Sequence, residues 1–244
     1  MHGRSMKKLQ ITFFVLLSMC IIALVPGVPA QAAGPFTCSD TVRIMPTGDS
    51  LTQGYASGVT NVGDQIAYRK TLHDALLAQG RQFDLVGSFT AGGNYAGFDP
   101  DHSGVPGWNV QQIEINIYDW LVANTPDIVL LHAGTNDVNV SFVNNYNRLL
   151  NNVDTYESDY NTEVTVVVAL IINRVTSTGD PVRIQRTNEF NAGLETLVNN
   201  RIANGDDLIL IDMENDAGII SVGQQSQDSA NAVAICRYHV IHCG

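Results

Sequence analysis

Apolar runs rich in branched residues alternate along this chain with longer segments of helical periodicity. The runs are short and several are apolar at every position, which is typical of strands buried on both faces of a parallel sheet. Five such runs predict strands, at Thr41–Met45, Phe83–Val86, Asp127–His132, Val164–Ile172 and Leu208–Ile211.

Between these runs, the sequence predicts helices at Gln65–Gln79, Val110–Asn124, Phe142–Tyr156 and Val182–Asn204. In the last segment, Phe190, Leu194 and Val198 fall on one stripe at helical spacing. Strand and helix in alternation predict an α/β fold, namely a three-layer α/β/α sandwich around a central parallel sheet of about five strands. The active site of such a sheet lies beyond the carboxyl ends of its strands.

One connection departs from this alternation. The segment from Gly87 to Asn109 is long, rich in glycine and without clear periodicity. Loops of this length within a compact domain are usually functional or disordered. We therefore expect this segment to be a functional or disordered loop.

The first residues predict a signal peptide. Arg4, Lys7 and Lys8 precede an uncharged apolar run, and Ala30-x-Ala32 follows as a cleavage site. The run is shorter than the roughly 20 apolar residues that a membrane-spanning helix needs. We therefore expect residues 1–32 to be removed, residues 33–244 to form a single domain, and the protein to be secreted and extracellular, with no membrane partner.

The net charge limits the classes of binding partner, and the cysteine count bears on disulfide pairing. Removing residues 1–32 takes away three basic residues and no acidic ones, so the net charge falls from −11 to −14. An acidic surface repels polyanions, which argues against nucleic acid and fits a neutral polysaccharide or a small molecule. Three cysteines remain, Cys38, Cys236 and Cys243, and their odd number leaves the disulfide pairing open.

Two polar motifs follow predicted strands at their carboxyl ends. Gly48-Asp49-Ser50 comes after the first strand, where a serine on the turn can act as a nucleophile. Gly134-Thr135-Asn136-Asp137 comes after the strand that ends at His132. Because parallel strands end at one edge of the sheet, both motifs are expected at the same edge.

These motifs resemble the conserved blocks of the SGNH or GDSL hydrolase superfamily, which has a flavodoxin-like fold. Within that superfamily, the segments Arg43–Ser50, Asp84–Ser88, Asp99–Trp108 and Pro126–Asp137 are similar to carbohydrate esterase family 3. Members of that family remove acetyl groups from xylan. The resemblance therefore implies a secreted serine esterase acting on acetylated polysaccharide or another small ester substrate, without a metal or organic cofactor.

The resemblance also implies roles for individual residues. Ser50 would be the nucleophile, and Gly107 and Asn136 would complete an oxyanion hole with the Ser50 N–H. Gly107 is preferred to Gly87 because it stands just before a helix and matches the family's Gly-Trp pattern. Asp49 and Asp137 are interpreted as structural residues that accept hydrogen bonds from nearby backbone N–H groups.

The general base is harder to locate. In the superfamily it is a histidine three residues after an aspartate, beyond the last strand, and the residues after Leu208–Ile211 contain no such pair. His242 is the candidate base, with His239 as the alternative. Asp228 would be the nearest carboxylate to orient it, and Asp212 and Asp216 also compete for that role. We expect the tail from about residue 221 to be atypical, because of a truncated or frame-shifted coding sequence.

The remaining histidines and the sequon have simpler interpretations. His132 is expected to be packed in the core, His102 to lie on the surface of the long loop, and His73 to be exposed on a helix. Asn139-Val140-Ser141 is a glycosylation sequon beside the candidate site, where a bulky sugar is not expected.

Two alternatives to an acetyl esterase stay open from the sequence. The missing Asp-x-x-His block is consistent with a non-catalytic or inactivated protein of this fold, such as a carbohydrate-binding remnant. A lysophospholipase or thioesterase of the same fold would keep the same site residues.

Overall fold

The computed structural model describes residues 41–55, 59–137, 143–173 and 180–213. All of them belong to one compact unit of the chain, Ala33–Gly244. The strands are β1 (Val42–Gly48), β2 (Phe83–Leu85), β3 (Phe89–Thr90), β4 (Asp101–Gly104), β5 (Ile128–His132), β6 (Thr165–Ala169) and β7 (Leu208–Ile211). The helices are α1 (Ser50–Gln53), the 3-10 turn η1 (Val62–Asp64), α2 (Ala67–Ala78), α3 (Val110–Asn124), α4 (Val143–Tyr160) and α5 (Pro181–Ala203).

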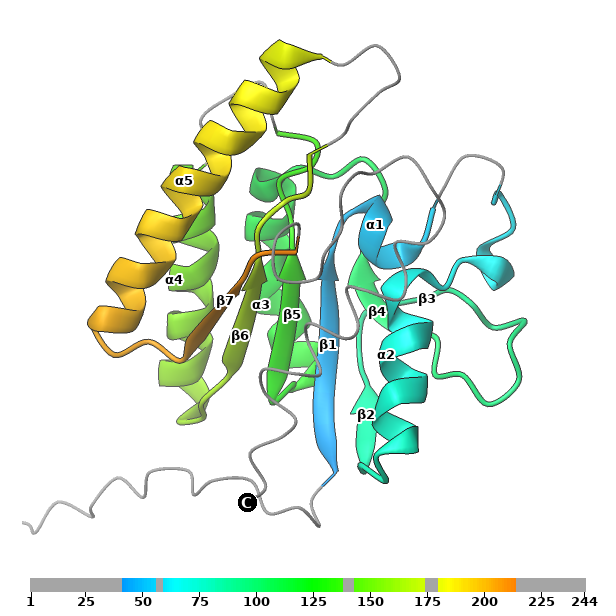
Figure 1. Cartoon of the computed structure of the whole chain (residues 1–244). Coiled ribbons are helices and arrows are strands. Elements are labelled where there is room, and N and C mark those ends of the chain that lie inside the picture. The colour runs from blue at the N-terminus through cyan, green and yellow to red at the C-terminus, as the bar shows by residue number, and fades with distance from the viewer. Residues whose placement is uncertain (1–40, 56–58, 138–142, 174–179, 214–244) are drawn as a thin grey trace, which may run out of the picture. The chain divides into compact units, whose positions relative to one another are not determined.

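The described strands form one sheet in the order β3-β4-β1-β5-β6-β7, with β2 paired to the start of β1 (Figure 1). All pairs are parallel except β3 with β4. Helices cover both faces, so the predicted α/β sandwich is confirmed. Side chains alternate along β5: Val129 and Leu131 join the core under α3, α4 and α5, while Ile128 and Leu130 join the core under α2.

Strand β1 is longer than predicted, because it continues through Pro46 to Gly48. A proline lacks the N–H that a central strand usually needs. Here β1 pairs with β2 as far as Ile44 and with β4 from Thr47 onward. Pro46 lies in the gap between these two partners, so its missing donor costs the sheet no hydrogen bond.

The prediction of a loop throughout Gly87–Asn109 is wrong. The segment contains β3 and β4, and β4 extends the sheet on the far side of β1 from β5. Strand β4 reads Asp-His-Ser-Gly and shows no apolar alternation, although three of its four residues are buried. Its position depends on pairing with Thr47 and Gly48, which local periodicity does not report.

Two histidines predicted at the surface are buried. His73 is 5% exposed, and its ring packs edge-on against Phe83 and Phe98 at centroid distances of 5.2 and 5.4 Å. His102 is fully buried within β4. His132 is buried at the end of β5, as predicted.

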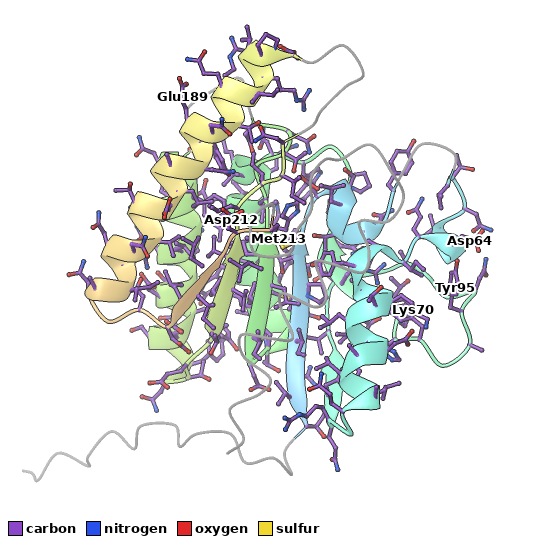
Figure 2. The ribbon with its side chains drawn as sticks, viewed as in Figure 1. Asp64, Lys70, Tyr95, Glu189, Asp212 and Met213 are labelled. Carbon is purple, nitrogen blue, oxygen red and sulfur yellow. The ribbon has the colours of Figure 1, made fainter. Side chains whose placement is uncertain are left out.

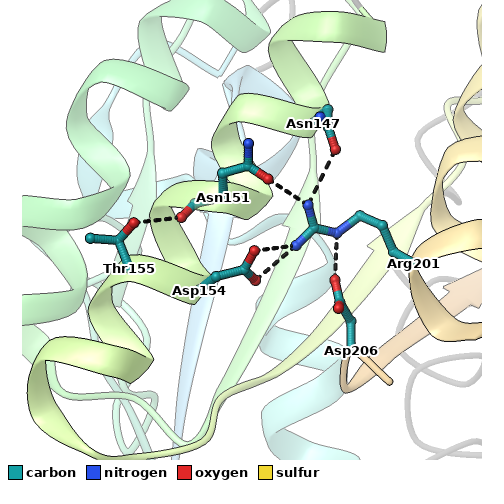
Figure 3. Close-up of polar contacts among 6 residues, drawn as sticks. All are labelled: Asn147, Asn151, Asp154, Thr155, Arg201 and Asp206. Carbon is teal, nitrogen blue, oxygen red and sulfur yellow. Dashed lines mark hydrogen bonds and ion pairs between the residues drawn. The ribbon is translucent and has the colours of Figure 1, made fainter. Parts of the chain in front are cut away.

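A polar cluster fastens α5 to α4 and to the amino end of β7 (Figure 3). Arg201 on α5 binds both carboxylate oxygens of Asp154 at 2.7 and 2.6 Å, and it binds Asp206 at 2.5 Å. Its Nη1 also donates to Asn147 and Asn151 on α4. The Arg201 side chain is only 12% exposed, so these contacts satisfy a charge that is largely removed from water.

Several predictions fall outside the described residues: the signal peptide, the three remaining cysteines, the sequon, and the tail with Asp216, Asp228, His239 and His242. Within the described part of the chain, no helix is both long and apolar enough to cross a membrane.

Candidate active site

Ser50 is the first residue of α1, directly beyond the carboxyl end of β1. Asp49 caps this helix, and its Oδ1 accepts a hydrogen bond from the Leu51 N–H at 2.9 Å. The Asp49 side chain is fully buried, which agrees with its predicted structural role. Ser50 itself is half-buried.

Glycines make this sharp turn sterically feasible. Gly48 pairs with His132 on β5, and a Cβ at Gly48 would collide with the His132 carbonyl. Gly54 ends α1 with a φ of 98°, and its N–H bonds to the Ser50 carbonyl at 2.9 Å. Only glycine adopts such a φ readily, so the four-residue helix has defined limits at both ends.

Gly107 lies in a tight turn after β4. The Trp108 N–H donates to the Val105 carbonyl at 3.2 Å, and Gly107 has a φ of 80°. Pro106 followed by glycine is typical of a type II turn, whose hydrogen bond does not use the glycine N–H. A Cβ at Gly107 would meet nothing within 4 Å, whereas one at Gly87 would collide with the backbone of His102. Gly107 therefore faces open space, and Gly87 is packed against β4.

Asn136 lies in the turn that follows β5 and is exposed. Its amide nitrogen donates to the Trp108 carbonyl at 2.8 Å. One residue later, Asp137 Oδ2 accepts from the Val110 N–H at 2.7 Å, in the first turn of α3. These two hydrogen bonds join the segment after β5 to the segment that contains Gly107.

The three predicted residues thus follow three neighbouring strands at one edge of the sheet. Gly104 of β4 is level with Gly48 of β1, which is level with His132 of β5. Ser50 comes two residues after Gly48, and Gly107 and Asn136 come a few residues after the partners of Gly48. This edge gathers a serine, a glycine turn and an amide side chain, the groups that acyl transfer requires.

The buried carboxyl of Asp137 is electrostatically unusual. The side chain is 1% exposed, and its Oδ1 has no hydrogen-bond partner within the described part of the chain. Burial raises the pKa of Asp137 to about 6, and the nearby charge of Asp49 adds to the increase, while the Val110 N–H opposes it. The carboxyl bonds a backbone N–H as predicted, but that of a residue distant in sequence.

His102 has the spacing of a catalytic pair, because Asp99 stands three residues before it. Its Nδ1 accepts from the Gly104 N–H at 2.9 Å, so the proton of the neutral ring is on Nε2. Burial, together with the charge of Arg69, lowers the pKa of His102 to about 3. Asp99 binds the Leu85 N–H instead of the ring. His102 therefore has no free nitrogen with which to accept the Ser50 proton.

Sequence reasoning missed Arg69, which lies on α2 and contacts the segment of Ser50. The side chain is fully buried and donates to the carbonyls of Thr52 and Gln53 at 2.9 Å each. A sequence signal existed, because Arg69, Leu72 and Leu76 share one helical stripe, and a charged residue on a buried stripe indicates a special role.

The described residues at this edge do not form a metal site. Among the residues that the structure describes, no group of three or more histidine, cysteine, aspartate or glutamate side chains could hold a metal ion.

Comparisons with known proteins show the family and the fold of the chain. A family model described as "GDSL-like Lipase/Acylhydrolase" matches residues 44–228. A multidomain esterase of Ruminococcus flavefaciens is 32% identical over 160 residues, which are 56% of this chain and 19% of that protein. The match thus covers only about a fifth of the relative's length.

Two solved structures share the fold over most of their length. The family 3 carbohydrate esterase of Clostridium thermocellum has a TM-score of 0.64 and 25% identity, over 82% of this chain and 95% of that chain. A family 3 carbohydrate esterase from Talaromyces cellulolyticus has a TM-score of 0.61 and 26% identity, over 80% of this chain and 94% of that chain.

Proposed function

The chain belongs to the GDSL-like lipase/acylhydrolase family of carboxylic ester hydrolases, and from this premise we propose that it removes acetyl or other short acyl groups from plant polysaccharide such as xylan. The names of the two family 3 carbohydrate esterases support a carbohydrate ester as the substrate class. The acidic composition would repel a polyanion, but it would not repel a neutral polysaccharide.

In the proposed reaction, Ser50 Oγ attacks the ester carbonyl carbon while a base takes its proton. The sugar hydroxyl then leaves with that proton, and water hydrolyses the acyl group from Ser50. The developing oxyanion is stabilised by the N–H groups of Ser50 and Gly107 and by the Asn136 amide. An amide nitrogen has two N–H donors, and the bond to the Trp108 carbonyl uses only one of them.

The observation that carries this proposal is the hydrogen bond between Asn136 and the Trp108 carbonyl. It holds the amide beside the Gly107 turn, which supports the proposal that two donors, from the segments after β4 and β5, serve one oxyanion hole. The bond from the Val110 N–H to Asp137 reinforces the same arrangement. Donors fixed in advance need no reorganisation when the charge develops, which is why they accelerate the reaction.

For the general base, the proposal assigns His242, with His239 as the alternative. Three of the six histidines lie among the described residues, and all three are buried. Met213, the last described residue before the part of the sequence that contains His239 and His242, lies just beyond the carboxyl end of β7 (Figure 2). A catalytic arrangement is set by geometry and not by sequence spacing.

The test is hydrolysis of an aryl acetate by the purified chain and by its Ser50→Ala variant. We expect turnover that the substitution abolishes, while Ser88→Ala on an exposed loop, used as the matched control, keeps the parental rate. A folded, monodisperse protein without turnover would instead favour the alternative of an inactive protein of this fold. Retained binding to xylan would then identify a carbohydrate-binding remnant.

A series of aryl esters of increasing chain length separates the acetyl esterase from a lysophospholipase or thioesterase. The proposal expects the highest kcat/KM with acetate, and a preference for long chains would contradict it. Release of acetate from acetylated xylan by the same preparation tests the natural substrate directly.

Secretion belongs to the same proposal, with cleavage after Ala32. The full chain is expressed in a secreting host, and the protein in the medium is analysed by mass spectrometry. The measured mass should be that of a chain that begins at Ala33. Retention of residues 1–32 in the exported protein would contradict the signal peptide.

A further inference from the structure

We propose that Arg69 is a positioning residue for the nucleophile, because its buried guanidinium fixes the short helix that begins with Ser50. The inference rests on the proposed role of Ser50 as the nucleophile. It adds a residue on α2 to a site otherwise formed by segments that follow β1, β4 and β5.

The guanidinium of Arg69 donates only to backbone carbonyl groups. Nε binds Thr52 at 2.9 Å, and Nη2 binds Gln53 and Gln65 at 2.9 and 2.8 Å. Both Nη atoms contact Ala91, at 3.2 and 3.1 Å, and Nη1 also binds Pro100 at 3.0 Å. Each nitrogen of this fully buried side chain is thus satisfied by the main chain.

Helix α1 has particular need of such a partner. It has four residues, and a helix this short is not stable by itself. The carbonyl groups of Thr52 and Gln53 lie at its C-terminal end, where the helix offers them no N–H partner. Arg69 binds these two carbonyls and adds a positive charge at the negative end of the helix. Ser50 lies within one turn of them, so any displacement of α1 moves its hydroxyl.

The same side chain joins α1 to the strand that leads to Gly107. Ala91 and Pro100 lie on the connection between β3 and β4, and Arg69 binds the carbonyls of both. A single cation therefore holds the segment of the nucleophile against the segment that precedes the Gly107 turn. Burial lowers the pKa of Arg69 to about 10, so the guanidinium remains charged at neutral pH.

Arg201 offers a matched control. It is also a largely buried arginine with several hydrogen bonds, but it lies at the amino end of β7, on the opposite edge of the sheet. Replacing either arginine by lysine keeps the charge and removes the planar set of donors. A general loss of stability should follow from both substitutions, whereas displacement of Ser50 should follow only from the change at Arg69.

The experiment compares Arg69→Lys and Arg201→Lys in aryl acetate hydrolysis and in amide hydrogen exchange. For Arg69→Lys we expect kcat to fall by roughly 10- to 100-fold with KM nearly unchanged, because misplacement by about 1 Å has effects of that size. The N–H groups of Gly54 and Tyr55, which bond to the Ser50 carbonyl, should exchange faster. Arg201→Lys should leave both readouts at parental values.

The outcomes separate this inference from the proposed function. A parental chain without Ser50-dependent turnover would refute the function, and the exchange measurement would still test Arg69. Arg69→Lys with parental kcat and parental exchange in α1 would overturn the inference, as would an equal loss of kcat in Arg201→Lys.

If Arg69→Lys does not fold, Gly54→Ala tests whether the position of α1 against α2 controls the rate. A Cβ at Gly54 would lie 2.8 Å from the Ala67 nitrogen and would disturb the contact between α1 and α2. A fall in kcat with a parental KM is expected, and a folded variant with parental kcat would count against the inference.

Discussion

Replacing Asp137 by asparagine should change the pH dependence of stability. The carboxyl is 1% exposed, Oδ2 bonds the Val110 N–H, and Oδ1 has no partner within the described part of the chain. Asparagine has nearly the same shape and can still accept from Val110, but it carries no charge. The substitution therefore isolates the cost of burying the ionised carboxyl.

The magnitude follows from the pKa. Burial raises the pKa of Asp137 from 3.8 to about 6, and one pKa unit corresponds to about 1.4 kcal/mol, so the ionised form costs about 3 kcal/mol in the folded state. The folded protein holds this proton more tightly than the unfolded chain does. The associated stability is thus fully present below pH 3.8 and is lost as the pH rises to about 6. Above that pH the cost is constant.

Urea unfolding of both proteins from pH 4 to pH 7 measures this effect. The free energy of unfolding of Asp137→Asn, relative to the parental chain, should increase by about 2.4 kcal/mol over that range, because a small part of the full effect is already lost at pH 4. Other titrating groups cancel in the difference because both proteins share them. Asp119→Asn on the exposed side of α3 serves as the control for removing a carboxylate. A difference between Asp137→Asn and the parental chain that stays constant with pH would refute the reasoning.

Three further substitutions test the site and the scaffold. Asn136→Ala removes the proposed oxyanion donor and should reduce kcat by about a hundredfold or more in the aryl acetate assay; a near-parental rate would exclude Asn136 from the proposed hole. Gly48→Ala forces a Cβ against the His132 carbonyl, so β1 and β5 must separate and thermal unfolding should shift well below the parental temperature; an unchanged Tm would contradict the close approach. Arg201→Met leaves Asp206 and Asp154 without their cation and should cost about 2 kcal/mol in urea unfolding, with kcat unchanged.

The sequence alone determined most of the regular structure. Helix Val110–Asn124 and strand Leu208–Ile211 have the predicted bounds, and the other predicted elements differ from their observed bounds by a few residues. Periodicity predicts these elements because each segment buries a continuous apolar face. Such a face requires apolar residues at a regular spacing within the same segment. The two motifs were expected at one edge because strands of a parallel sheet end together.

Tertiary structure decided the features whose partners are distant along the chain. Strand β4 has no apolar pattern and is a strand because it pairs with β1. His102 has the spacing of a catalytic residue, yet its burial and its bond to Gly104 exclude it as a base. Arg69 was missed because its five acceptors are backbone carbonyls, which every residue type supplies equally.

The contact between Asn136 and Trp108 illustrates the same limit. Sequence could identify an amide and a glycine turn as candidates, since each motif has a recognisable composition. Whether they meet depends on how β4, β1 and β5 pair, and pairing is fixed by packing over the whole sheet. Local chemistry was therefore readable from the chain, while the distances between chemical groups were settled only when distant segments packed together.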